Sequence, residues 1–316
     1  MQPNRKQDRR CTYVVALSPA ARGLDLRPFA EYLSTLSVAG CEVIVLDSSE
    51  AIDEHCRVLR WVARHIAVQE PIDVVRTASQ VASCDKIIVA GENVRYNVAD
   101  LTELCAMLDA HEVVEAQDYL EPMPWWGGID AGRMLVHRGI DPHPDRGATF
   151  AFRRTIPRGL RGFDATGSTD PVRVLALHGA EVVSANELFV RRCPPRLGEW
   201  LRERPREAGL DFDVPAKSGF FFALIPMAIL LTLMGGGRLA IGYASAVAFA
   251  SVVLAVRGRL GAGAFFPLRA CLFAPLWVLE RSVSVYWALL QRVRGTVVEQ
   301  PAAIATQGST KVASGE

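Results

Sequence analysis

Two long uncharged apolar runs constrain this chain more than any other feature. Residues 219–234 (GFFFALIPMAILLTLM) and 239–256 (LAIGYASAVAFASVVLAV) contain no charged side chain, and a glycine-rich turn separates them. Each run is close to the roughly 20 residues that a helix needs to span a bilayer. We therefore predict a transmembrane helical hairpin over residues 218–257. Two buried core helices are the alternative.

Positive charge is abundant beside the predicted hairpin and sparse in its turn. The turn carries only Arg238, whereas the flanks carry Arg202, Arg204, Arg206, Lys217, Arg257 and Arg259. Basic flanks stay on the cytoplasmic side of a membrane. We therefore expect both ends of the hairpin to face the cytoplasm. The hairpin has no intramembrane charge, which argues against a transporter or channel.

The segment 264–294 is apolar but is interrupted by prolines and charged residues. Trp277, Tyr286 and Trp287 have rings suited to the headgroup region of a membrane. We predict an amphipathic interfacial segment here, with a third span as the alternative. The tail over 296–316 and the basic N-terminus over 1–11 are predicted to be disordered.

Charge and cysteine content exclude two classes of protein. The chain has 316 residues, and its 35 Lys and Arg nearly balance 34 Asp and Glu, so we expect no nucleic-acid partner. Its seven cysteines are widely spaced and contain no CxxC pair. This pattern favours reduced thiols, several of them buried, over a zinc site or a disulfide framework.

The front of the chain alternates between apolar strands and amphipathic helices. We predict strands at 12–17, 42–46, 72–75, 86–90, 112–116, 148–153 and 181–184. We predict helices at 25–38, 51–66, 76–84, 99–110, 129–138 and 171–179. Such alternation indicates an α/β domain with a mostly parallel sheet. Open sheets of this kind place ligands at the carboxyl ends of their strands. Asp47-Ser48-Ser49 and Gly91-Glu92-Asn93 each follow such a strand.

Three passages resemble family 2 glycosyltransferases of the bacterial membrane-associated type. VIVLDSSE (43–50) resembles a strand that ends in an Asp-rich turn. ASCDKIIVAGENVRYNVADLTELCAMLD (82–109) resembles the stretch that carries the family's DxD metal motif. QDYLEPMPWWGGIDAGRMLVHRGIDPHPDRGATFAFRR (117–154) resembles a segment with a P-W pair, a D-x-x-R helix and a G-T-x-x-x-R-R strand. In the family, GGFD and an acidic pair follow; here they are Arg161-Gly162-Phe163-Asp164 and Thr169-Asp170.

The resemblance covers about residues 12–215 and implies a GT-A nucleotide-diphospho-sugar transferase fold, a Rossmann-like, mostly parallel sheet. It implies transfer of a sugar from a nucleotide-sugar donor to a lipid-linked or envelope-glycan acceptor. The enzyme would act at the bacterial inner (plasma) membrane, with its catalytic domain in the cytoplasm.

The motifs depart from the family pattern at several positions. The DxD site is Gly91-Glu92-Asn93, so Glu92 would be the single protein carboxylate for a divalent cation, Mg²⁺ or Mn²⁺, completed by donor phosphates. The acidic pair is Asp170-Pro171, and the family's PxxNE turn is Pro19-Ala20-Ala21-Arg22-Gly23. The QxxRW-like stretch has its nearest counterpart in residues 200–206, without the glutamine. A catalytically degenerate relative, which binds nucleotide or a partner without turnover, is therefore the alternative function.

The resemblance assigns the donor side to residues that also have ordinary structural explanations. Asp47, Ser48, Glu92, Asn93 and Arg95 would bind the nucleotide sugar. Asp47 could equally cap a helix or turn. Glu92 could be an ordinary loop acid, and Arg95 could cap its loop instead of pairing with phosphate.

The catalytic and acceptor residues have similar alternatives. Asp170 would be the base that deprotonates the acceptor, or an N-cap followed by Pro171 at the first helical position. Trp125, Trp126 and Asp130 would lie on the acceptor side. The two tryptophans could instead pack in the core or against the membrane, and Asp130 could pair with Arg133 one helical turn away.

Overall fold

The structure is a computed structural model of the chain. It describes residues 10–17, 25–69, 72–141, 149–160, 163–166, 170–213 and 215–294. The predictions for the tail, for most of the N-terminal segment and for the Pro19–Gly23 turn lie outside these residues.

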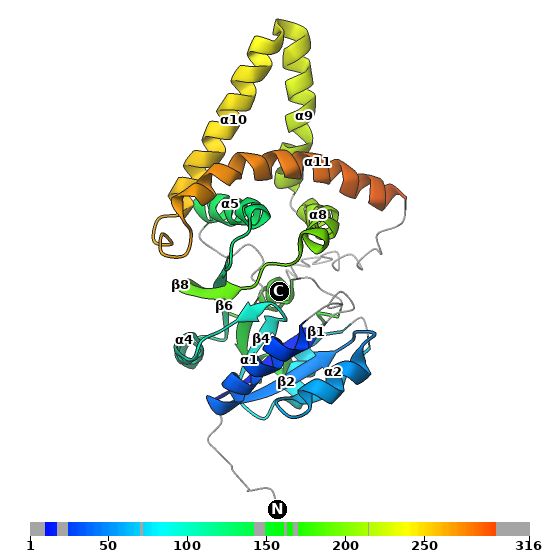
Figure 1. Cartoon of the computed structure of the whole chain (residues 1–316), viewed down its shortest axis with the longest axis vertical. Helices are drawn as coiled ribbons and strands as arrows, with labels where there is room; N and C mark the ends of the chain where they lie inside the picture. Colours follow the sequence, from blue (N-terminus) through cyan, green and yellow to red (C-terminus); the bar gives the residue numbers. More distant parts are fainter. Residues whose placement is uncertain are drawn as a thin grey trace, which may run out of the picture.

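A mixed eight-stranded sheet forms the lower part of the molecule (Figure 1). Its strands are β1 (Cys11–Leu17), β2 (Cys41–Asp47), β3 (Arg64–Ala67), β4 (Lys86–Gly91), β5 (Val94–Arg95), β6 (Val113–Leu120), β7 (Thr149–Arg153) and β8 (Val182–Arg192). They lie in the order β3-β2-β1-β4-β7-β6-β8-β5. Strands β3, β2, β1 and β4 are parallel, β6 is parallel to β8, and β7 and β5 run antiparallel to their neighbours. The α/β prediction is confirmed.

Helices pack on both faces of the sheet. These are α1 (Leu26–Val38), α2 (Ile52–Leu59), α3 (Val74–Val81), α4 (Val98–Ala110), α6 (Ile156–Gly159) and α7 (Pro171–Leu177). One apolar core holds Tyr13, Phe29 and Leu104 under α1 and α4. The other holds Ile44 and Val75 with residues of α3 and α7. Because both faces are covered, the central strands are mostly apolar.

Two predicted elements are wrong, for identifiable reasons. The helix expected over 51–66 ends at Leu59, and Arg64–Ala67 instead forms β3 beside β2. The strand expected over 72–75 does not form. Asp73 caps α3, because its carboxylate accepts a hydrogen bond from the Arg76 backbone N–H at 2.9 Å. At the first place, pairing with β2 overrides the local apolar pattern. At the second place, the Asp73 cap overrides it.

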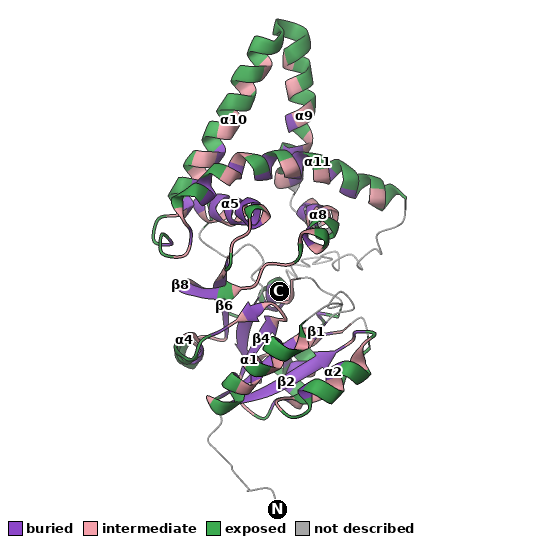
Figure 2. Ribbon diagram, in the orientation of Figure 1, coloured by how far each residue is buried: buried purple, intermediate pink, exposed green. Residues whose placement is uncertain are grey.

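A helical layer separates the sheet from a projecting hairpin. The layer contains α5 (Trp125–Ile140), α8 (Leu197–Leu210), the 3₁₀ segments η2 (Asp211–Asp213) and η3 (Leu268–Phe273), and α11 (Ala274–Val293). The hairpin consists of α9 (Pro215–Gly235) and α10 (Gly237–Gly258). Figure 1 shows α11 crossing beneath the hairpin, and Figure 2 shows that the hairpin is mostly exposed. Its helices are long and apolar enough to cross a membrane, and they are not the buried core helices of the alternative.

The base of the hairpin is held on α5 by glycines. A Cβ at Gly139 would meet the backbone oxygen of Leu254, and a Cβ at Gly258 would meet that of Leu135. A Cβ at Gly132 would lie 2.8 Å from the backbone nitrogen of Ala274. Glycine permits this backbone contact, so α5 joins the hairpin to the α/β part at a fixed position.

Helix α11 presents two apolar faces. Its inner face packs in a third core, formed with α5, α8 and α9, and includes Trp277, Val278 and Val285. Its outer face leaves large apolar side chains exposed, namely Leu276, Leu279, Val283, Trp287 and Leu290. These five share one side of the helix because their spacing is three or four residues. Among the described residues, packing accounts for the inner face only.

Candidate functional site

The carboxyl edge of the parallel strands brings two of the predicted polar segments to one side of the sheet. Asp47 ends β2 beside Leu17 of β1, and Gly91 ends β4 beside Ala16 of β1. Since neighbouring strands are about 4.8 Å apart, Asp47 and Gly91 are about 10 Å apart across β1. The two segments therefore flank the same strand end.

Asp47 is buried in a cluster with two histidines. Its Oδ2 lies 2.8 Å from Nδ1 of His55 and 2.9 Å from Nε2 of His65. Its Oδ1 accepts a hydrogen bond from the Ser49 backbone N–H at 2.9 Å. Burial works against ionisation, but the hydrogen bonds from Ser49, His65 and His55 hold the pKa of Asp47 below its ordinary value. The carboxylate is directed into the protein by these partners.

Ser48 joins this edge to the neighbouring strand. Its backbone N–H and its hydroxyl each donate to the carbonyl oxygen of Leu17, both at 3.0 Å. Ser48 thereby fixes the end of β2 against the end of β1.

The turn between β4 and β5 carries Glu92, Asn93 and Arg95. The Arg95 guanidinium donates to the carbonyl oxygens of Glu92 at 2.6 Å and Val94 at 2.8 Å. It also lies 4.8 Å from the ring centroid of Tyr32, a favourable cation–π contact. The carbonyl oxygen of Asn93 accepts from the backbone N–H of Cys193, just after β8, at 2.8 Å. The turn is held from three sides, and Arg95 caps it as the structural alternative expects.

Helix α8 lies next to this turn. Burial raises the pKa of Glu92, the Arg95 charge opposes that rise, and the negative charge of Glu199 on α8 adds to it. Glu92 likewise acts on Glu203, one helical turn further along α8. A positive charge added beside a carboxylate in this setting would stabilise its ionised form.

A neighbouring face of α8 holds Asp130 of α5. The Trp200 indole N–H donates to Asp130 Oδ2 at 2.8 Å, and the Arg204 guanidinium donates to Oδ1 at 2.9 Å. Arg133, one helical turn along α5, lies 3.8 Å from the same carboxylate. Burial opposes ionisation, yet the charges of Arg204, Arg133 and Arg192 keep the Asp130 pKa low. Asp130 is thus a buried ionic link between α5 and α8.

Trp125 and Trp126 begin α5 in different environments. The Trp125 side chain is 62% exposed, whereas Trp126 packs against the third core, which α11 forms with α5, α8 and α9. Their rings make an edge-to-face contact with centroids 5.8 Å apart. The Trp126 indole nitrogen is buried without a hydrogen-bond partner among the described residues. Trp125 is therefore the one of this pair that is open to a ligand or a membrane.

Asp170 lies on a different element, at the start of α7. Its carboxylate accepts from the Arg173 backbone N–H at 2.9 Å, and Pro171 occupies the first helical position. This is the N-cap geometry that the sequence allowed as the structural alternative.

Several residues of this edge had no signal in the sequence. His55 and His65 come from a helix and a strand that were predicted as one helix, so their convergence on Asp47 was hidden. Trp200 and Arg204 do fall in the stretch compared with the QxxRW pattern. Their spacing of four residues on one helix face could have indicated a shared partner.

No preformed metal site is present in the described part of the chain. Among these residues, no group of three or more His, Cys, Asp or Glu side chains is arranged to hold an ion. At the turn, the available donors are the Glu92 carboxylate and the Asn93 amide. These two residues alone do not make a binding site for Mg²⁺ or Mn²⁺, which prefer about six oxygen ligands.

Comparison with known proteins gives only distant similarities. No protein-family model matches the chain, and no curated protein sequence matches it. Among solved structures, it is similar to the mannosyltransferase PcManGT from Pyrobaculum calidifontis in complex with GDP-Man and Mn²⁺, at 16% identity over 88% of this chain and 87% of that one, with a TM-score of 0.48.

Two further structures are similar over different shares of the chain. Glucosyl-3-phosphoglycerate synthase from Mycobacterium tuberculosis, solved with Mn²⁺ and UDP-glucose, has 14% identity over 64% of this chain and 77% of that one, with a TM-score of 0.42. S. aureus TarS 1–349 has 11% identity over 92% of this chain and 93% of that one, with a TM-score of 0.41. Identities and TM-scores this low do not assign a family.

Proposed function

We propose that this chain is a membrane-associated glycosyltransferase with a GT-A-like domain. It would move a sugar from a nucleotide-sugar donor to a lipid-linked or envelope-glycan acceptor. The observation that carries the proposal is the placement of the Gly91–Arg95 turn. The turn follows a central parallel strand, where such sheets bind nucleotides, at the position that the resemblance assigns to the donor phosphates.

The donor would lie along the carboxyl edge between Asp47 and Glu92. Asp47 accepts hydrogen bonds from its own histidines, so its part would be to shape the edge through Ser48 and Ser49 rather than to touch the nucleotide. Arg95 supplies positive charge beside Glu92, which favours a diphosphate over a neutral ligand.

Transfer requires a bond to break on the donor side and a proton to leave on the acceptor side. The bond between the anomeric carbon and the diphosphate oxygen breaks, and the nucleoside diphosphate departs with the negative charge. The acceptor hydroxyl attacks that carbon and loses its proton to a base. Asp170 is the proposed base.

The proposal assigns no catalytic step to a divalent cation. GT-A enzymes use such an ion as a Lewis acid on the diphosphate. Because Glu92 and Asn93 alone do not form a site, no step above is assigned to a metal. A cation that acted here would have to enter with the donor's phosphates and bind Glu92 as its protein carboxylate.

The acceptor side would face the membrane. Trp125 is exposed at the start of α5, and α5 carries the hairpin through its glycine contacts. A membrane-bound acceptor could therefore approach along the same helix whose other end holds the hairpin. The basic flanks favour a cytoplasmic catalytic domain, and the family resemblance implies a bacterial inner membrane.

Specific observations favour the alternative of a degenerate relative. Asp170 has N-cap geometry, Asp47 is engaged by two histidines, and the turn has a single carboxylate. A protein with these features could bind a nucleotide without turning it over.

One experiment separates the two functions. Detergent-purified full-length protein is incubated with a panel of nucleotide sugars and membrane lipid extract, with and without Mg²⁺ or Mn²⁺. Release of nucleoside diphosphate is followed, and thermal unfolding is measured with each nucleotide. Turnover of one donor supports the enzyme. Stabilisation by a nucleotide without turnover of any donor supports the degenerate binder, and the absence of both rejects the proposed donor site.

Matched variants assign the residues. Glu92→Gln removes the charge at the turn, and Glu103→Gln makes the same change at an exposed position on α4. Asp170→Asn removes a base but keeps an N-cap, since Asn caps helices about as well as Asp. Asp25→Asn makes that change at the N-cap of α1. Loss of turnover in the first member of each pair alone supports the assigned roles.

A further inference from the structure

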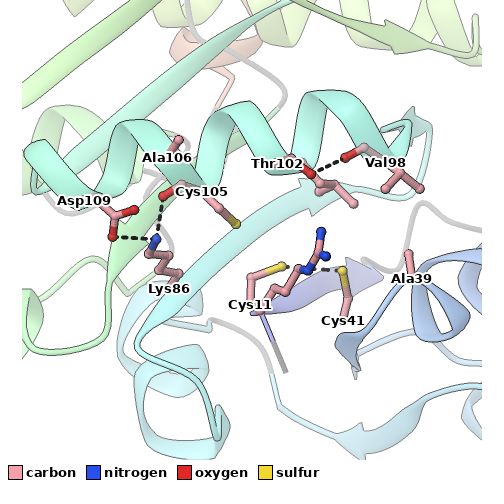
Figure 3. Close-up of a pocket in the computed structure, with 11 residues that line it drawn as sticks. Cys11, Ala39, Cys41, Lys86, Val98, Thr102, Cys105, Ala106 and Asp109 are labelled. Atoms are coloured by element: carbon pink, nitrogen blue, oxygen red, sulfur yellow. Dashed lines mark hydrogen bonds and ion pairs between the residues drawn. The ribbon is translucent and has the colours of Figure 1, made fainter. Parts of the chain in front are cut away.

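A cavity opens at the opposite edge of the sheet from the candidate site. Cys11, Cys41 and Lys86 are the first residues of β1, β2 and β4, and they line it together with Arg10 and with Cys105 and Asp109 of α4 (Figure 3). Its volume is about 490 Å³. The cavity is large enough to admit water and small polar solutes. Three of the seven cysteines therefore border one cavity, with their side chains largely buried.

Two of these thiols are in direct contact. Cys11 and Cys41 are paired in register on adjacent parallel strands, and their sulfur atoms are 3.5 Å apart. Adjacent strands are about 4.8 Å apart, within the Cα separation that disulfides span. The sulfur atoms need to approach by about 1.5 Å to reach the bond length of a disulfide. Rotation of the two side chains can supply most of that movement.

The surroundings of the thiols shift their pKa values in opposite directions. The hydrogen bond from Cys11 and the positive charge of Arg10 lower the pKa of Cys41, while burial and Cys105 oppose that shift. The pKa of Cys105 is lowered by Cys11 and by the charge of Lys86, again against burial. The pKa of Cys11 is raised by its hydrogen bonds with Cys105 and Cys41. Neighbouring positive charge of this kind is typical of reactive cysteines.

We propose that Cys11 and Cys41 form a peroxide-sensitive modification site, oxidised by hydrogen peroxide to a reversible cross-strand disulfide. The Cys41 thiolate attacks one peroxide oxygen, the O–O bond breaks, and hydroxide leaves, giving a sulfenic acid at Cys41. The Cys11 sulfur then attacks the Cys41 sulfur, the S–O bond breaks, and the Cys11 proton leaves with the departing oxygen as water. In total, two thiols lose two electrons and one peroxide is reduced to two waters.

Among the described residues, the three cysteines of this cavity do not form a group that could hold a metal ion. The cavity also lies at the amino ends of the strands, away from Asp47 and Glu92. Oxidation would tie β1 to β2 without touching the proposed donor site.

The test uses the full-length protein in detergent, reduced, desalted and exposed to hydrogen peroxide. The protein is then alkylated, digested and examined by mass spectrometry. The proposal predicts a cross-linked pair of peptides that contains Cys11 and Cys41, 2 Da lighter than the sum of the reduced peptides, and restored by dithiothreitol. This measurement on the unaltered chain needs no variant.

Variants then test which thiol reacts first. Cys41→Ser is expected to slow consumption of peroxide by this site by at least about tenfold, because the remaining Cys11 thiol holds its proton. Cys84→Ser and Cys193→Ser remove half-buried thiols elsewhere and are expected to leave the cross-link unchanged. Oxidation confined to Cys56, Cys84 or Cys193, or a disulfide between Cys11 and Cys105, would overturn the proposal.

Discussion

Two carboxylates at the same edge of the sheet have pKa values that are shifted in opposite directions. Asp47 receives hydrogen bonds from His55, His65 and Ser49, and its pKa is lowered. Glu92 lies close by with its pKa raised by burial. From this contrast we propose that Asp47 has a structural part and that Glu92 is the carboxylate that meets a ligand.

Replacing Asp47 tests its structural role. Asp47→Asn places a donor where two imidazoles need an acceptor, so we expect a loss of about 2 to 4 kcal/mol in unfolding free energy. Asp53→Asn, on the exposed side of α2, should change the unfolding free energy by only a few tenths of that loss. Chemical denaturation at pH 7 measures both. Equal stability of the two variants would show that the histidine cluster contributes little.

The same carboxylate predicts a pH dependence. The Asp47 pKa is lower in the folded chain than the value of about 3.9 in unfolded chains. Its contribution to stability is therefore fully present above pH of about 4 and is lost as the pH falls through the folded-state pKa. Denaturation curves between pH 7 and pH 3 should show a smaller loss of stability for Asp47→Asn than for the unaltered chain.

Glu92 should behave in the opposite sense. Because its pKa is raised on folding, the ionised carboxylate opposes folding once the pH rises through the folded-state pKa. Glu92→Gln should therefore stabilise the unliganded protein at neutral pH, on the order of 0.5–2 kcal/mol, while it reduces donor turnover. Thermal unfolding and turnover of the same preparation give both results. A variant that is less stable but fully active would contradict the assigned role.

At the scale of elements, local signals in the sequence were sufficient where a cap and an apolar run coincide. Asp25 and α1, or Asn97 and α4, are examples. They were insufficient where distant pairing decides the structure. Strand β3 forms beside β2 although its four residues have little apolar character. Strand β8 extends to Arg192, well beyond the predicted 181–184, because it pairs with β6 and β5.

Helix α8 was predictable only as a basic stretch before the hairpin. In the structure, two adjacent faces of this helix interact with two different neighbours. Glu199 and Glu203 lie toward Glu92, and Trp200 and Arg204 hold Asp130. The candidate site and the membrane-side layer therefore share one helix. No local pattern in a single sequence indicates such a shared element.

The contact between α5 and α10 can be tested at a glycine. A Cβ at Gly258 would overlap the backbone of α5, so Gly258→Ala should cost about 1–3 kcal/mol through overpacking. Gly242→Ala, in the same helix, meets nothing within 4 Å and should gain up to about 1 kcal/mol from helix propensity. Thermal unfolding in detergent compares them. Similar melting temperatures for the two variants would show that the helices are not in backbone contact.

At the scale of the molecule, three layers lie in order: the sheet with its helices, the layer of α5, α8 and α11, and the hairpin (Figure 1). The two apolar runs predicted the hairpin, and the alternating pattern predicted the sheet. The two-faced character of α11 was visible only in part from its sequence, because its inner face depends on α5 and α9. We propose that the outer face, with Leu279 and Val283, contacts the membrane surface.

The proposed orientation can be probed at the hairpin turn. Gly237→Cys in a cysteine-free background should react with a membrane-impermeant maleimide added outside intact cells. Cys193 restored in the same background should react only after the membrane is opened. The hairpin turn is the point farthest from the basic flanks, which are expected to stay cytoplasmic. Labelling of both positions from the same side would contradict a hairpin that spans the membrane.

The most direct test of the central claim is transfer of labelled sugar from nucleotide-sugar donors into membrane lipid extract by the full-length protein. We predict a labelled lipid product from one donor. The product should be lost in Asp170→Asn and retained in Asp25→Asn, because only the first change removes a base while both keep a helix cap. Turnover that survives Asp170→Asn would exclude Asp170 as the base. If no donor yields product and no nucleotide stabilises the protein, the carboxyl edge of this sheet is not a nucleotide-sugar site.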